Sequence, residues 1–417
     1  MLVPLPEATA DVAGAKAGTL GVLLRAGLPV PPGVVVPFAA WRAAAERLDV
    51  ARLARAEEPD AVRRVVARAA VDPALEAALA QALHDLGGGP VAVRSSAAGE
   101  DTAERSAAGQ HLTRLGVTGP VDVVEAVRAC WTSLWSPEAV AYRRLTGPDA
   151  APGTAAPETA VLVQRHVDAD VAGVLFTAAA DGPVVVEASW GLGETVVGGL
   201  VTPDRYVVDA AGRVDPVVGS KCTRLDRSGT GLVTTPVAGE RRTVRCLDDD
   251  AVRRLARLGR HLAALRGGPQ DVEWAVAGGA VHVLQARPVT ADLPRGRSGE
   301  PVGPPDGARV GRVLVGVAGS RGVRRGVVRV VDGPDGFGAV RPGDVLVCRF
   351  TDPAWTRLFD VVAAVVTEVG GLLSHAAVVA REHGIPAVLA VPGVLVALRD
   401  GDRVEVDGAA GTVRLLA

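Results

Sequence analysis

The chain has 417 residues, enough for two or three domains with substantial hydrophobic cores. Its 45 basic and 47 acidic residues are dispersed and give a formal net charge of −2, which argues against a binding surface for nucleic acid or for a membrane. The four cysteines lie far apart with no C-x-x-C pair, so neither a disulfide framework nor a zinc site is expected. The sequence shows no leader-like N-terminus and no apolar run of membrane-spanning length, which predicts a cytoplasmic protein.

Lysine is rare in this sequence. Only Lys16 and Lys221 are lysines, against 43 arginines, and each follows closely on a glycine. An ammonium that persists against such a bias can mark a position where a guanidinium does not fit, and a phosphate site is one such position. Lys16 is therefore a candidate phosphate ligand, and Lys221 a lesser one.

The first part of the chain alternates helical and strand patterns. Residues 11–27 predict a helix that opens at Asp11 and closes at Gly27, followed by a proline-stiffened strand. Residues 40–86 have helical periodicity and predict packing helices without chemistry. A short buried strand then ends at Arg94, and a long loop of small and polar residues follows. Such a loop lets backbone N–H groups approach phosphates, and the arginine can clamp an anion.

The middle of the chain ends in a predicted hairpin. It is preceded by a helix broken near Pro137, by three strands (160–167, 171–177 and 183–189) and by a helix from Asp249 to Arg266. The glycine pattern in WGLGETVVGG has no βαβ unit around it, so we reject a dinucleotide-binding interpretation. In the hairpin, residues 271, 273 and 275 share one face of the first strand, and residues 285 and 287 share one face of the second. Carboxylate, amide oxygen and guanidinium brought together there suit Mg²⁺ and phosphate.

The last part of the chain carries a histidine at the start of a short helix. The pattern predicts a strand from Val361 to Val366, a Gly-Gly turn, Ser374 as a possible N-cap, and a helix from His375 that ends at Gly384. The helix dipole would lower the pKa of the imidazole and favour its neutral, nucleophilic form, and the free N–H groups could hold a phosphate. A capping or core histidine is the alternative.

Three segments resemble one enzyme family. GGLLSHAAVVAREHGIPAV resembles the phosphohistidine motif of phosphoenolpyruvate-utilising enzymes, a group with phosphoenolpyruvate synthase, pyruvate phosphate dikinase and rifampicin phosphotransferase. GAKAGTLGVLLRAGLPVPPGVVV and VRSSAAGED with SAAGQ resemble signatures of the ATP-binding domain of that family. The resemblance implies an α/β (α+β) protein, with an ATP-grasp domain over 1–290 (subdomains about 1–155 and 156–290). A linker over 291–308 and a swivelling β/β/α phosphohistidine domain over 309–417 would follow.

The same resemblance implies roles for individual residues. His375 would carry the phosphoryl group, with Lys16 and Arg287 as further catalytic residues that hold phosphate. Glu273 and Gln285 would be Mg²⁺ ligands. The remaining ATP-binding residues would be Arg94 at the nucleotide, Ser106, Gly109 and Gln110 in a loop over the phosphates, and Gln164 beside the purine. Glu138 stands where the family often has arginine.

The resemblance implies an ATP-dependent dikinase. ATP would pyrophosphorylate His375, AMP and phosphate would be released, and phosphohistidine would phosphorylate a small-molecule acceptor. The sequence contains neither the phosphoenolpyruvate barrel nor the large acceptor domain of the longer enzymes. Three other readings stay open: an ATP-charging subunit that serves a separate acceptor-binding protein, an ATP-dependent ligase of natural-product assembly, and a catalytically dead nucleotide sensor.

Overall fold

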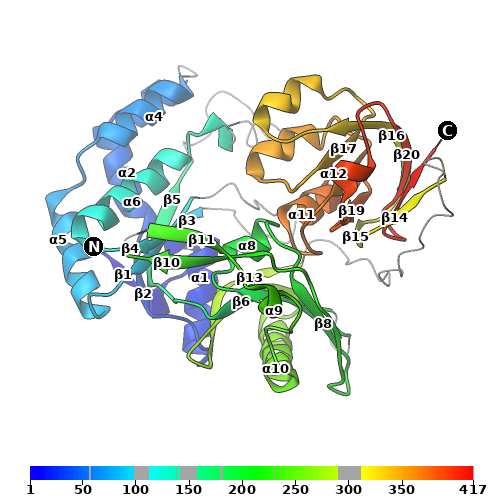
Figure 1. Cartoon of the computed structure of the whole chain (residues 1–417). Helices are drawn as coiled ribbons and strands as arrows, with labels where there is room; N and C mark the ends of the chain where they lie inside the picture. Colours follow the sequence, from blue (N-terminus) through cyan, green and yellow to red (C-terminus); the bar gives the residue numbers. More distant parts are fainter. Residues whose placement is uncertain are drawn as a thin grey trace. The chain divides into compact units, whose positions relative to one another are not determined.

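The computed structural model describes residues 1–55, 58–97, 112–137, 139–140, 157–178, 182–229, 231–289 and 311–416. The chain forms two compact units that interleave along the sequence. The first comprises Met1–Asp170, Asp226–Val233 and Gln270–Pro288, and the second Val171–Leu225, Thr234–Pro269 and Val289–Ala417. Figure 1 follows these elements along the chain. The linear domain bounds expected from the sequence remain a prediction.

The first unit is built on a five-stranded antiparallel sheet with the order β1-β2-β5-β3-β4. Helices pack on it around a core that includes Trp41 and Trp131, whose ring centroids lie 5.7 Å apart. Its strands are β1 (Val3–Pro4), β2 (Gly33–Val36), β3 (Val91–Ala97), β4 (Thr113–Val117) and β5 (Thr159–Arg165). Its helices are η1 (Leu5–Glu7), α1 (Ala10–Arg25), α2 (Phe38–Arg47), α3 (Val50–Arg55), α4 (Pro59–Arg68), α5 (Pro73–Asp85) and α6 (Gly119–Ser133). The predicted packing helices of residues 40–86 are therefore present.

A hairpin completes the first unit. It consists of β12 (Gln270–Ala277) and β13 (Ala280–Pro288), joined by Gly278 and Gly279. Both glycines have positive φ, 54° and 80°, as a two-residue hairpin turn requires. The hairpin forms as the sequence predicts, with a register shift after Glu273.

Helix α1 differs from its prediction at its start. It begins at Ala10 rather than Asp11, and it is kinked at Gly14, whose φ is 78°. A side chain at Gly14 would collide with the backbone of Ser96 on β3. The kink therefore lets the turn after Gly14 lie against β3, where the Ala17 N–H donates to Ser96 Oγ at 3.1 Å.

The second unit contains an antiparallel run of strands and an eight-stranded sheet. The run is β6 (Val171–Thr177), β7 (Val184–Trp190), β8 (Asp204–Val208) and β9 (Val214–Val217), with α8 (Glu194–Val197), α9 (Gly239–Arg242) and α10 (Asp249–Arg266). Helix α10 has its predicted bounds because its signals are local. Asp248 accepts the Ala251 N–H at 2.7 Å, and Gly267 ends the helix at φ 76°. Strands β10 (Thr223–Ser228) and β11 (Gly231–Pro236) form a separate two-stranded sheet.

The eight-stranded sheet has the order β14-β21-β20-β16-β17-β18-β19-β15. Its strands are β14 (Val313–Val315), β15 (Val317–Ser320), β16 (Val323–Val330), β17 (Val345–Cys348), β18 (Ala364–Thr367), β19 (Ala387–Leu389), β20 (Arg403–Asp407) and β21 (Thr412–Leu415). Helices α11 (His375–Glu382) and α12 (Val394–Ala397) and the turns η2 (Pro334–Ala339) and η3 (Pro353–Leu358) complete it. Strands β18 and β19 are parallel and joined through α11, so His375 lies beyond the carboxyl end of β18.

One expectation about strands needs correction. The strand predicted from Val361 begins only at Ala364. The three strands predicted after residue 157 are present in two different sheets: β5 pairs with β2 and β3, whereas β6 pairs with β7. Alternation of side chains identifies a strand but does not select its partner. Within the ranges described above, none of the helices is both long and apolar enough to cross a bilayer.

Candidate functional site

Three of the predicted site residues, Arg94, Glu273 and Gln285, contact one another in the first unit. Arg94, on β3, is only 9% exposed. Its Nη2 donates to Glu273 Oε2 at 3.1 Å and to Gln285 Oε1 at 2.8 Å, and its Nη1 donates to the Leu284 carbonyl at 2.7 Å. Glu273 and Gln285 are cross-strand partners in the hairpin, so their side chains share a face. Residues nearly two hundred positions apart are thereby brought together.

The next pair along the same hairpin is an ion pair. Asp271 and Arg287 are also cross-strand partners, and Arg287 Nε donates to Asp271 Oδ2 at 2.7 Å. Both side chains are largely buried. The sequence placed Asp271 on the polar face without giving it a role. Its carboxylate orients the guanidinium of Arg287 beside the Glu273–Gln285 pair.

The oxygens of Glu273 and Gln285 fit a magnesium ion. Both lie within hydrogen-bond distance of the same Nη2 atom of Arg94, and carboxylate and amide oxygens are hard ligands that Mg²⁺ prefers. In the described part of the chain, no three His, Cys, Asp or Glu side chains gather as a metal cluster. If Mg²⁺ bound with a nucleotide, phosphate and water oxygens would have to supply the rest of its ligands.

Two further predicted ATP ligands are buried in the first unit. Lys16 is 6% exposed, and its Nζ donates to the Ser95 carbonyl at 3.2 Å, next to Arg94 on β3. Gln164, on β5, donates its amide to the Pro31 carbonyl at 2.8 Å. The predicted loop residues Ser106, Gly109 and Gln110, together with Glu138, lie outside the described residues.

In the second unit, His375 is the first residue of α11 and is 6% exposed. Its Nδ1 lies 2.9 Å from Thr351 Oγ1, its Nε2 lies 3.4 Å from Thr356 Oγ1, and the ring meets Phe359 edge-on at 6.2 Å. Burial lowers the pKa of His375 to about 4, so the imidazole is neutral near pH 7. Two hydroxyls thus hold a neutral imidazole in place, and a neutral imidazole can act as a nucleophile.

The sequence correctly predicted His375 at the start of a helix, but it did not predict the hydrogen bonds of Ser374 or the burial of the imidazole. Ser374 occupies the N-cap position, but its hydroxyl donates to the Gly371 carbonyl at 2.9 Å and makes no cap hydrogen bond. Burial lowers the pKa of the imidazole, a cause that the sequence alone did not reveal. Thr351 and Thr356 were missed as site residues, because they lie about twenty positions before His375 and no local pattern connects them to it.

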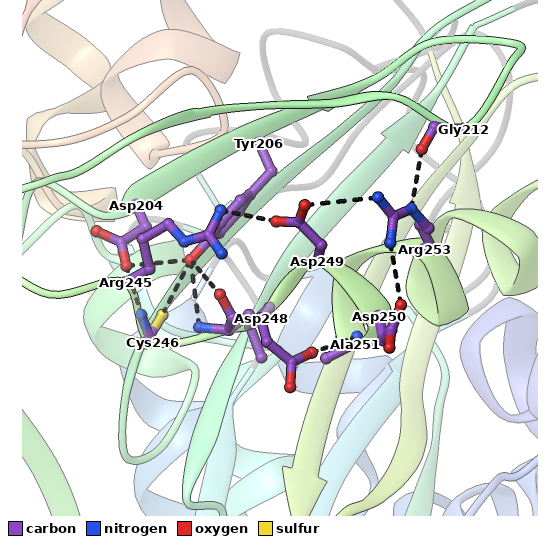
Figure 2. Close-up of polar contacts among 11 residues, drawn as sticks. Asp204, Tyr206, Gly212, Arg245, Cys246, Asp248, Asp249, Asp250, Ala251 and Arg253 are labelled. Carbon is purple, nitrogen blue, oxygen red and sulfur yellow. Dashed lines mark hydrogen bonds and ion pairs between the residues drawn. The ribbon is translucent and has the colours of Figure 1, made fainter.

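Lys221 does not behave as a phosphate ligand. It is wholly buried, forms an ion pair with Asp204 and donates to the carbonyls of Gly219 and Arg242, each at 3.0 Å. Asp204 also accepts the Cys246 N–H at 2.8 Å and the Tyr206 hydroxyl at 3.2 Å. Figure 2 shows Asp204 with Tyr206 and Cys246, and beside them the contacts of Asp249 with Arg245 and Arg253 at the start of α10. The ammonium persists here because it neutralises a buried carboxylate.

Comparison with known proteins identifies the family. Residues 10–298 match the pyruvate phosphate dikinase AMP/ATP-binding domain, and residues 340–411 match the mobile domain of PEP-utilising enzymes. The first match covers more than half of the chain, so the chain belongs to the pyruvate phosphate dikinase family of ATP-binding phosphotransferases. The expected order, a nucleotide-binding part of the pyruvate phosphate dikinase type followed by the mobile domain of PEP-utilising enzymes in a mixed α and β fold, is confirmed.

Curated relatives agree with this family. The chain is 35% identical to a probable phosphoenolpyruvate synthase of Archaeoglobus fulgidus, over 96% of this chain and 56% of the relative. It is 33% identical to one of Methanothermobacter thermautotrophicus (96% and 61%) and 35% identical to the phosphoenolpyruvate synthase of Aeropyrum pernix (96% and 56%). The chain thus spans somewhat more than half the length of these relatives. An ATP complex of a D-alanine–D-alanine ligase from Bacillus anthracis aligns with 66% of this chain and 55% of its own at 7% identity. Its TM-score of 0.28 is too low to support an argument.

Proposed function

We propose that this chain is a dikinase-type phosphotransferase in which ATP phosphorylates His375. The observation that carries the proposal is the histidine itself: a buried imidazole, kept neutral, at the first position of a helix that follows a Gly-Gly turn. Its family supplies the ATP-binding half. We further propose the linear division into a nucleotide-binding part (1–290), a linker (291–308) and a phosphohistidine domain (309–417). Dependence on ATP favours the cytoplasm as the compartment.

The nucleotide would be held by the cluster around Arg94. Lys16, Arg94 and Arg287 would neutralise the phosphates of ATP, because cationic donors placed at the transferred charge stabilise its transition state. Glu273 and Gln285 would hold Mg²⁺, which supplies positive charge at the phosphate oxygens when it is bound. The remaining assignments follow the family: Ser106, Gly109 and Gln110 over the phosphates, and Gln164 beside adenine.

We propose Nε2 of His375 as the nucleophile, because its contact with a hydroxyl, 3.4 Å to Thr356 Oγ1, is longer than that of Nδ1. A proton on Nδ1 can be donated to Thr351 Oγ1 at 2.9 Å, which leaves the lone pair on Nε2. In the proposed step, Nε2 attacks the β-phosphorus of ATP. The bond between that phosphorus and the oxygen that bridges it to the α-phosphorus breaks, and AMP leaves with this bridging oxygen. Water then removes the terminal phosphate, and phosphohistidine remains for transfer to an acceptor.

The acceptor is proposed to be a small molecule, bound by this chain or by a separate protein. The names of the curated relatives point to phosphoenolpyruvate formation, so pyruvate is the first acceptor to test. In that case this chain would act as an ATP-charging component.

The nucleotide product tests the proposal. The purified chain is incubated with ATP and Mg²⁺, with and without pyruvate, and the nucleotides are separated. We expect one equivalent of AMP and phosphate per chain without acceptor. AMP formation should continue with pyruvate if this chain binds it, and only after the acceptor-binding protein is added if a separate protein binds it. A His375→Ala variant should form neither. Formation of ADP, or AMP formation that survives in His375→Ala, would exclude the mechanism.

A further inference from the structure

A buried carboxylate holds the loop that leads to His375. Glu187 lies on β7 and is 2% exposed. Its Oε1 accepts the Leu372 N–H at 2.9 Å, and its Oε2 accepts the Leu373 N–H at 3.3 Å. Both segments belong to the second unit, although they are 185 residues apart in sequence.

The loop is shaped to admit this carboxylate. A Cβ at Gly371 would lie 2.4 Å from Glu187 Oε2, so a side chain there would have to displace the carboxylate. A Cβ at Gly199 would lie 2.9 Å from Ser374 Cβ, one residue beyond the leucines. Both glycines therefore allow the loop and the carboxylate to approach closely.

The backbone N–H and the backbone carbonyl of Leu372 both have side-chain partners. Its N–H donates to Glu187, and its carbonyl accepts from Arg381 Nη1, on α11, at 2.9 Å. Burial raises the pKa of Glu187, while the Leu372 N–H, the charge of Arg205, the Leu373 N–H and the charge of Arg381 act to lower it. Positive charge from two elements therefore faces the carboxylate.

Apolar side chains close the contact from water. The leucines form one cluster with residues of β6 and α8: Val174, Phe176, Val196, Leu372 and Leu373. Hydrogen bonds to a carboxylate are strong in such an environment, and an unpartnered buried N–H is unfavourable. Any displacement of the loop must break the two hydrogen bonds together with the apolar contact.

We propose that Glu187 is a positioning residue that clasps the Leu372–Leu373 backbone onto β7 and so fixes the imidazole of His375 for phosphorylation by ATP. The role of the clasp in phosphorylation rests on the proposed function. Both carboxylate oxygens are engaged by the loop, so Glu187 acts on the rate at which His375 is phosphorylated and not on the affinity for ATP.

Two variants and a matched control test the clasp in the full chain. Glu187→Gln keeps the shape but replaces one acceptor oxygen with a donor, and Arg381→Ala removes the hold on the Leu372 carbonyl and stands in if Glu187→Gln does not fold. Glu240→Gln, at an exposed carboxylate of the same unit, is the control. Three quantities are measured: hydrogen–deuterium exchange of the Leu372 and Leu373 amides, the rate of modification of His375 by diethyl pyrocarbonate, and the rate of label transfer from β-labelled ATP.

In the clasp variants we expect exchange of the two amides to rise about tenfold or more, as the loss of a hydrogen bond to a charged group implies. Modification of His375 should accelerate, and label transfer should slow about tenfold with the Kd for ATP unchanged, again from the same loss. Unchanged exchange in both variants would overturn the clasp. Faster exchange with a wild-type rate of label transfer would reduce Glu187 to a structural residue and overturn its positioning role. A wild-type chain that takes no label would refute the proposed function instead. The clasp would then be tested only by amide exchange and by the rate of His375 modification.

Discussion

Replacing His375 with glutamine should remove a pH-dependent loss of stability from the second unit. The folded pKa of His375 is about 4, whereas an unfolded chain has a histidine pKa of about 6.5. Because the folded pKa is the lower one, the unfolded chain binds the proton first as the pH falls. Stability is therefore lost from about pH 6.5 downward and the loss levels off near about pH 4. At about pH 5 the loss reaches about 2 kcal/mol, since each pH unit in this window corresponds to about 1.4 kcal/mol.

Native-state hydrogen exchange of α11 measures this loss in the folded unit. The free energy of opening is determined for wild type and His375→Gln at about pH 7 and about pH 5, and the difference between the two proteins cancels other titrating groups. The opening free energy of wild type relative to that of His375→Gln should fall by about 2 kcal/mol from about pH 7 to about pH 5, because only the wild type has the buried imidazole. A difference that does not depend on pH would show that the imidazole is not held neutral by burial, and the reasoning about its nucleophilic form would fail.

Three further variants test other parts of the structure. Lys221→Met should lower the free energy of unfolding in urea by about 3 kcal/mol or more, because Asp204 is left buried without its cation. Adding Asp204→Asn should restore part of this free energy, and a loss below about 1 kcal/mol would contradict the buried pair. Gly14→Ala should lower stability by about 1–3 kcal/mol in thermal unfolding, because it strains a positive φ and crowds Ser96; an unchanged Tm would refute the kink. Glu273→Gln should raise the Mg²⁺ concentration required for AMP formation by about tenfold, and an unchanged requirement would remove Glu273 from the metal site.

The sequence was most informative where the signals are local. Helix α10 has its predicted bounds because Asp248 and Gly267 supply its caps within the segment itself. The β12–β13 hairpin follows from a Gly-Gly turn between alternating strands, and its register aligns Glu273 with Gln285. Counted back from the turn, a regular register would set Glu273 opposite Leu284, and only the register shift between Glu273 and Trp274 sets it opposite Gln285. The hairpin could therefore be predicted from the sequence, but this pairing could not.

The features that could not be predicted depend on contacts between distant segments. The carboxylate of Glu187 meets the Leu372 N–H across 185 residues, and no periodicity in either segment encodes that pairing. Strand β5 joins a different sheet from β6 because strand partners are selected by packing. Lys221 was rare enough to attract attention, but only its burial against Asp204 reveals a structural use. Rarity in composition indicates constraint without indicating its kind.

Transfer of label from β-labelled ATP to His375 tests the central claim most directly. Wild type, His375→Ala and His383→Ala are incubated with the nucleotide and Mg²⁺, and protein-bound label is assayed for acid and base stability. His383 lies on the partly exposed end of the same helix and serves as the matched control. We predict acid-labile, base-stable label in wild type and His383→Ala and none in His375→Ala. Label that persists in His375→Ala, or a wild-type chain that binds ATP and Mg²⁺ yet takes no label, would contradict the account.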